Sequence, residues 1–203
     1  MSLADLLKTH TAELHRRAET RPFQKSLVSG NLDRNSLCLY LAQLGCVHEA
    51  LEEVIACPEL AAFHPLTSSH AQRIEADLRA LGGVSEVLEP AQTRADRLLA
   101  AARSDPWFAL GALYVLEGSM NGNRFIARAL APALQLAPGA EGLSYWDPYG
   151  PAQRQRWADF RAALDELKLS EAQRARVLAG AEFMFEAVMD ISDAVHESLI
   201  AVL

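Results

Sequence analysis

The stretch WFALGALYVLEGSMNGNRFIARAL, residues 107–130, decides the fold. Its first half is apolar nearly all round a helix, which predicts a central, buried helix. It nevertheless contains Gly111, Gly118 and Gly122, which share one helical face at 100° per residue. Glycine inside a helix costs about 0.5–1 kcal/mol relative to alanine. The bare face therefore indicates that something approaches the backbone closely, either another helix or a flat ligand, unless the glycines mark a kink.

Prolines, glycines and capping residues divide the rest of the chain into further helices, because no stretch alternates as a strand would. The predicted helices run through Leu3–Ala18, from Pro22 to Gly30, from the Asn31–Asn35 caps to Pro58, from Thr67 or Ser68 to Gly82, from Pro90 through Leu99, from Asp105-Pro106 to about Leu130, and near 151–168 and 170–201. A break is expected at His64-Pro65, and the longest loop at 132–150. The prediction is an all-α, single-domain bundle of seven to nine helices over residues 1–203.

Composition limits the classes of function. The chain has 203 residues, half of them apolar, and a net charge of −7. This acidic balance argues against a nucleic-acid partner. The N-terminal segment lacks the apolar run of a signal peptide, and the most apolar run, residues 107–116, is too short to span a membrane. We therefore expect a cytoplasmic protein without a membrane partner, whose Cys38, Cys46 and Cys57 are reduced residues of the core.

Three ionisable residues line one flank of the first predicted helix. Lys8, His15 and Glu19 lie together at the edge of the apolar stripe formed by Leu7 and Leu14. His15 and Glu19 are four residues apart, so their side chains can meet. A histidine that binds a metal usually gives its second ring N–H to a carboxylate or carbonyl, which Glu19 could supply. The alternative is an ordinary solvated helix edge.

Two stretches together resemble one known family. LKTHTAELHRRAETRPF, residues 7–23, looks like the proximal helix of heme oxygenases, and LYVLEGSMNGNRFIARAL, residues 113–130, looks like the distal helix of their bacterial branch. The closing segments WADFRAALDEL, residues 157–167, and SEAQRARVLAGAEFMFEAV, residues 170–188, are similar in pattern. The resemblance implies a heme oxygenase-like helical fold over most of the chain.

The resemblance also implies roles on the proximal side and at the heme edge. His15 would be the axial ligand of the heme iron, with Glu19 as its hydrogen-bond partner. Lys8, Tyr114 and Arg161 would lie near the heme propionates. Alternatively, Arg161 is a surface arginine and Tyr114 a core residue.

On the opposite side, Gly118, Ser119 and Gly122 would form a distal wall that lets backbone lie close over the ring. Phe185 would pack against the macrocycle, unless it belongs only to the core. The family usually has a second glycine where this chain has Asn123. That amide could hydrogen-bond to bound oxygen, tilt the heme, ligate iron weakly, or point away.

The implied function is oxidative degradation of heme, which is both substrate and cofactor, to biliverdin, carbon monoxide and ferrous iron. O₂ and external electrons would be required. The donor would be a ferredoxin or a flavin reductase, and Arg16, Arg17 and Arg21, beside Lys8, could form a basic patch for it.

Two alternatives remain open from the sequence. One is a heme-binding or heme-sensing protein of the same fold that does not degrade heme. The other is a heme-free enzyme on a related bundle. A thiaminase-like enzyme needs a nucleophilic cysteine with acidic partners, which the three cysteines do not show. A di-iron enzyme needs two Glu-x-x-His motifs, and the chain has none.

Overall fold

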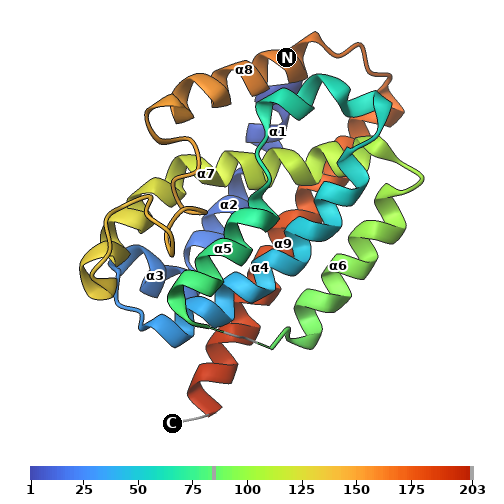
Figure 1. The fold of residues 1–203 in the computed structure, drawn as a ribbon. Helices are drawn as coiled ribbons and strands as arrows, with labels where there is room; N and C mark the ends of the chain where they lie inside the picture. The colour runs from blue at the N-terminus through green and yellow to red at the C-terminus, as the bar shows by residue number, and fades with distance from the viewer. Residues whose placement is uncertain (84–85, 202–203) are drawn as a thin grey trace.

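The computed structural model describes residues 1–83 and 86–201, and every regular element in them is helical (Figure 1). The prediction of an all-α fold is therefore confirmed. The elements in order are α1 (Leu3–His10), α2 (Ala12–Glu19), α3 (Pro22–Ser29), α4 (Arg34–Ile55), the 3-10 helix η1 (Pro58–Leu66), α5 (His70–Leu81), α6 (Glu89–Ala102), α7 (Pro106–Leu134), the 3-10 helix η2 (Gly150–Ala152), α8 (Gln153–Glu166) and α9 (Glu171–Ala201).

Local chemistry explains most of the helix ends. Asp33 caps α4 by accepting a hydrogen bond of 2.7 Å from the backbone N–H of Ser36. Gly30 and Gly82 end α3 and α5 in the left-handed conformation, with φ of 68° and 69°. Pro22 begins α3, where the missing N–H of proline is harmless.

Four boundaries differ from the sequence-based prediction. The first helix is divided at Thr11, whose hydroxyl donates to the carbonyl of Leu7, although the apolar stripe continues across this point. The predicted break at His64-Pro65 is wrong, because both residues lie inside η1. Helix α5 starts only after Ser69. The central helix extends beyond Pro132 to Leu134, so the long loop starts later than expected.

Helices α7 and α9 form the centre of the bundle and pack against each other (Figure 1). A Cβ atom on Gly111 would collide with the carbonyl oxygen of Val177, and one on Gly180 would collide with that of Phe108. These two glycines therefore allow the backbones of α7 and α9 to meet. Close helix packing accounts for the first of the three glycines on the bare face.

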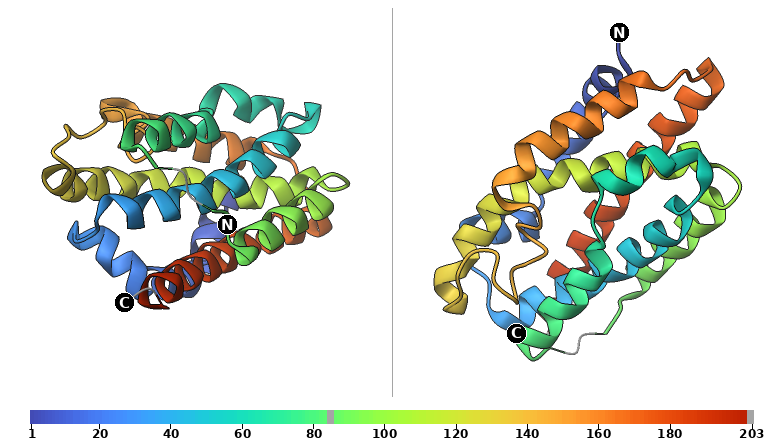
Figure 2. Two further views of the ribbon diagram at one scale, coloured as in Figure 1. Left: turned by 60° about the horizontal axis from the view of Figure 1, so that its bottom comes forward. Right: turned by 45° about the horizontal axis from the view of Figure 1, so that its top comes forward.

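The other helices surround this pair. Helix α4 packs between α5 and α6, while α2 and α3 contact α9. Figure 2 shows α8, in orange, lying along α7, and the two helices are in contact. Among the described residues, no helix is long and apolar enough to cross a membrane.

Candidate functional site

His15, Glu19 and Phe185 meet at the contact between α2 and α9. Nδ1 of His15 lies 3.5 Å from Oε2 of Glu19. The imidazole stands edge-on to the ring of Phe185, with centroids 5.8 Å apart and an interplanar angle of 69°. The side chain of His15 is 60% exposed and that of Glu19 69% exposed. The imidazole is thus oriented by two neighbours and remains accessible to a ligand.

Residues expected near the propionates gather where α1, α7 and α8 meet. Arg161 donates to Asp5 of α1 at 3.2 Å. The pKa of Tyr114 is raised above its ordinary value, chiefly by burial. The charge of Arg161 opposes this rise, and that of Asp5 adds to it. Lys8 is exposed on the same helix as Asp5. Arg161 therefore lies near enough to Tyr114 to influence its pKa, and it is paired with Asp5, a carboxylate not expected at the site.

The three glycines on one face of α7 have three different surroundings. Gly111 faces the backbone of α9, as described above. At Gly118, a Cβ atom would lie 3.1 Å from Cη2 of Trp157, an aromatic residue of α8 that the sequence analysis did not include in the site. At Gly122, nothing lies within 4 Å of such an atom. The open part of the bare face is therefore at Gly122, one turn after Gly118.

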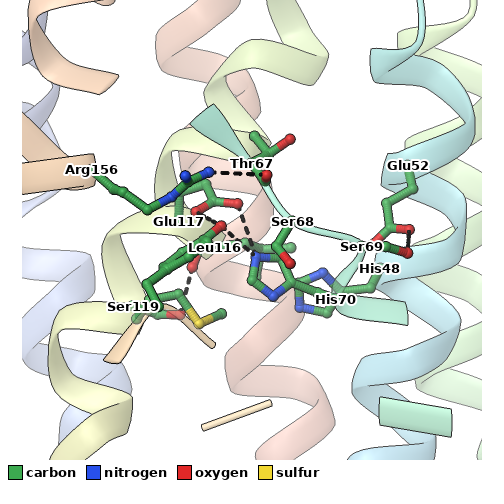
Figure 3. Close-up of polar contacts among 12 residues, drawn as sticks. His48, Glu52, Thr67, Ser68, Ser69, His70, Leu116, Glu117, Ser119 and Arg156 are labelled. Carbon is green, nitrogen blue, oxygen red and sulfur yellow. Dashed lines mark hydrogen bonds and ion pairs between the residues drawn. The ribbon is translucent and has the colours of Figure 1, made fainter. Parts of the chain in front are cut away.

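Ser119 and Asn123 have their polar groups engaged within the protein. The Ser119 hydroxyl donates to the carbonyl of Leu116 at 2.7 Å (Figure 3). Asn123 is buried, and its Nδ2 donates to the sulfur of Met120 at 3.5 Å. Helix α7 is continuous through these positions. Of the alternatives open for Asn123, this geometry fits the one in which the amide points away from the distal space.

A buried polar network lies beneath this part of α7, and the sequence analysis missed it. We define the network as His48, His70, Glu117, Tyr145 and Tyr149. The His70 imidazole and the Glu117 carboxylate point toward each other, with Nε2 2.9 Å from Oε1 (Figure 3). Both side chains are only 4% exposed. The Tyr149 hydroxyl donates to the other carboxylate oxygen of Glu117 at 2.9 Å.

His48 and Tyr145 form the second half of the buried network. Nε2 of His48 lies 3.1 Å from the Tyr145 hydroxyl, and its ring centroid is 5.1 Å from that of His70. Burial, and then the neighbouring His70, lowers the pKa of His48 well below its ordinary value. Burial raises the pKa of Tyr145 well above its usual range. Both groups are therefore neutral near pH 7, and the phenol can donate to the imidazole.

The cysteines have the character of core residues. Cys38 is buried, and Cys46 and Cys57 are half-buried. Burial raises the pKa of the Cys38 and Cys46 thiols, which lowers the fraction of reactive thiolate. This environment does not favour a nucleophilic cysteine of the thiaminase type at either position.

The fold and the site define a class: a helical bundle with an accessible histidine on one helix and an open glycine face on another. Comparison with known proteins identifies the class further. The heme oxygenase family model matches residues 1–194. The chain belongs to the heme oxygenase family.

Individual relatives agree with this assignment. Heme oxygenase 1 of Gallus gallus is 26% identical over 207 residues, covering 96% of this chain and 70% of that protein. Heme oxygenase of Xanthomonas campestris is 38% identical over 115 residues, covering 54% of this chain and 58% of that protein. The structure of heme oxygenase-1 from Synechocystis, in complex with heme, superposes with a TM-score of 0.87 at 21% identity, covering 100% of this chain and 96% of that one.

Proposed function

We propose that this protein is a heme oxygenase that binds heme through His15 and opens the macrocycle to biliverdin, releasing carbon monoxide and ferrous iron. The observation that carries the proposal is the accessible imidazole of His15 on α2, oriented by Glu19 and Phe185. The open position of α7 at Gly122 agrees with it. The family model and the relatives named as heme oxygenases support it.

The residues present fit a heme. A flat macrocycle needs a wall without side chains, and the backbone at Gly122 provides one. It also needs an imidazole at the iron and an aromatic surface beside it, which His15 and Phe185 provide. Lys8 and Arg161 supply cations for the propionates. Because Arg161 contacts Asp5, we expect it to exchange that carboxylate for a propionate when heme binds.

Each protein group then has a limited task. Heme iron supplies the O₂ chemistry, and the protein orients the substrate and controls access to it. Nδ1 of His15 lies 3.5 Å from the Glu19 carboxylate, so Nε2 would be the nitrogen that could hold the heme iron. Gly118 and Gly122 would form the distal wall above a bound heme, with the indole of Trp157 lying against Gly118.

Electrons come from an external donor, for which we propose a ferredoxin or a flavin reductase. The basic patch expected from Arg16, Arg17 and Arg21 beside Lys8 is smaller than the sequence suggests. Arg16 is paired with Glu13 at 2.6 Å, and Arg21 with Asp193 at 3.3 Å. Arg17 and Lys8 are exposed. These two cations are the part of the patch that we propose contacts an acidic donor. We place the reaction in the cytoplasm, as the sequence analysis expects.

A hemin titration tests the proposal directly. We expect a saturable one-to-one Soret shift for the native protein, and a weakened or altered spectrum for His15→Ala. His10→Ala is the matched control, because His10 lies on the preceding helix and pairs with Glu182 at 2.6 Å. Its spectrum should match that of the native protein.

The second stage adds a reductant in air. Loss of the Soret band, growth of bile-pigment absorption and trapping of carbon monoxide on myoglobin are the expected results. Stable heme binding without degradation would instead identify a non-degrading heme-binding protein. Absence of saturable binding would refute the heme assignment, and an unchanged spectrum for His15→Ala would show that another residue binds the iron.

A further inference from the structure

Trp157 covers one position of the bare face of α7 and leaves the next position open. Its six-membered ring lies against Gly118, with Cη2 at 3.1 Å and Cζ2 at 3.5 Å from the place of a Cβ atom. One turn further along the same face, Gly122 has no neighbour within 4 Å. A flat ligand that lies on Gly122 and extends toward Gly118 must therefore meet the edge of the indole.

The indole is held in place by its neighbours. It stacks on Phe160 with centroids 5.6 Å apart and planes at 14°. It also lies against Tyr114, at 5.4 Å and 42°. One turn earlier on α8, the Gln153 amide donates to Asn121 of α7 at 3.3 Å. These contacts fix the ring relative to α7, so it can act as a firm limit and not as a mobile cover.

We propose that Trp157 sets the in-plane position of heme on the distal wall, and thereby determines which meso carbon of the macrocycle is opened. The proposal rests on the proposed function. The meso carbons are chemically similar, so the one beneath the distal oxygen site is selected by how the macrocycle is seated. Trp157 touches the substrate edge and is a specificity-determining residue.

The size of the Trp157 side chain matters because the ring fills the space beside Gly118. Trp157 also lies among Leu66, Glu117, Tyr149, Gln153, Arg156 and Phe160, and the space between these residues is too narrow for a water molecule. Removal of the indole would open space beside Gly118, where Cη2 now lies 3.1 Å from the place of a Cβ atom. A macrocycle held at its iron by His15 would then have room to turn in its own plane, and a different meso carbon would come to the distal position.

The test compares the native protein with Trp157→Ala, with Trp107→Ala as the control. Trp107 is a half-buried tryptophan at the start of α7, eleven residues before Gly118. One readout needs only heme binding: the hyperfine-shifted heme methyl resonances of the ferric cyanide complex, which report how the macrocycle is rotated in its site. The second readout is the distribution of biliverdin isomers, separated by chromatography.

We expect Trp157→Ala to shift the heme methyl resonances. We also expect it to raise the share of the minor biliverdin isomers about tenfold, because one apolar contact is worth about tenfold in discrimination. Trp107→Ala should change neither. Identical resonances and isomers for Trp157→Ala and the native protein would overturn the proposal. If the alanine variant does not fold, Trp157→Leu makes the same test. Failure of the native protein to bind or degrade hemin is a different result, which contradicts the proposed function.

Discussion

The imidazole of His15 meets the ring of Phe185 edge to face, with centroids 5.8 Å apart and planes at 69°. This contact joins a residue of α2 to one of α9 and leaves Nδ1 directed at Glu19. The orientation of the proposed iron ligand is therefore set from two sides, by an aromatic ring and by a carboxylate. The two neighbours can be tested separately.

Phe185→Leu should weaken hemin binding. Leucine keeps the site apolar but removes an aromatic contact worth about 0.5–1.5 kcal/mol, so we expect a Kd raised about three- to tenfold. The measurement is a hemin titration followed at the Soret band. Phe183→Leu is the control on the same helix, because Phe183 packs on Phe108 at 5.4 Å. Equal effects of the two variants would contradict a specific role for Phe185.

Glu19→Gln should weaken the iron–imidazole interaction without unfolding the protein. A carboxylate behind a metal-binding histidine commonly contributes 10- to 100-fold in metal affinity. Glu19 is 69% exposed, so solvent screens its charge. We therefore expect the lower end of this range, a hemin Kd raised about tenfold. The readouts are the hemin Kd and the iron–histidine stretching frequency, which should fall. Glu13→Gln, on the same helix but paired with Arg16, should leave both values as in the native protein.

The buried pair of His70 and Glu117 should contribute to stability as a unit. Removal of one partner of such a pair costs about 3–5 kcal/mol, because the other is left buried without its partner. We therefore expect Glu117→Leu and His70→Leu each to lower the free energy of unfolding by about 3 kcal/mol, and the double variant to lose much less than the sum. Urea denaturation measures all four proteins. Strict additivity would show that the two groups do not depend on each other.

His48 should make the protein less stable in mild acid. Its pKa is lowered by burial in the folded state, while the unfolded chain has the ordinary value near 6.5. Below pH 6.5 the unfolded state therefore binds the extra proton, and the free energy of unfolding falls by up to about 1.4 kcal/mol per pH unit until the folded-state pKa is reached.

Urea denaturation between pH 7.5 and 5 measures this loss of stability. His48→Gln keeps a hydrogen-bonding side chain beside Tyr145. In this variant the free energy of unfolding should fall less as the pH is lowered, because the contribution of His48 is absent. Identical pH profiles for the native protein and the variant would contradict the assignment to His48.

The helices were largely predictable, because their ends depend on local chemistry. Asp33, Gly30 and Pro22 act at the positions where the sequence suggests an end. The division at Thr11 was missed because the apolar stripe passes through it unchanged. Local patterns describe which face is buried, and they do not report a small change in helix direction.

The site was less predictable, because it depends on what lies opposite each residue. Glu117 is the one acid in the stretch 107–130, a signal that it needs a buried partner. That partner, His70, is 47 positions away, and nothing in the sequence connects them. The contact of Trp157 with Gly118 is likewise tertiary, so the sequence does not reveal it. The sequence showed the bare face of α7 but not which glycine is open.

The different surroundings of Gly111 and Gly122 allow stability and heme binding to be separated with the same substitution. In Gly111→Ala, the new methyl group would collide with the Val177 carbonyl and lie 2.7 Å from the backbone nitrogen of Ala181. Helices α7 and α9 would have to move apart. We expect a loss of about 2 kcal/mol or more in the free energy of unfolding, since overpacking outweighs the gain in helix propensity.

Gly122→Ala should have the opposite effect on stability. The methyl group enters open space, so the gain in helix propensity of about 0.5–1 kcal/mol should raise the free energy of unfolding. The same methyl group would stand on the wall against which heme lies, so the hemin Kd should rise about tenfold, as expected for the loss of about 1.4 kcal/mol. Urea denaturation and hemin titration of this single variant give both values. A variant that is more stable and binds hemin as tightly as the native protein would show that heme does not contact α7 at Gly122.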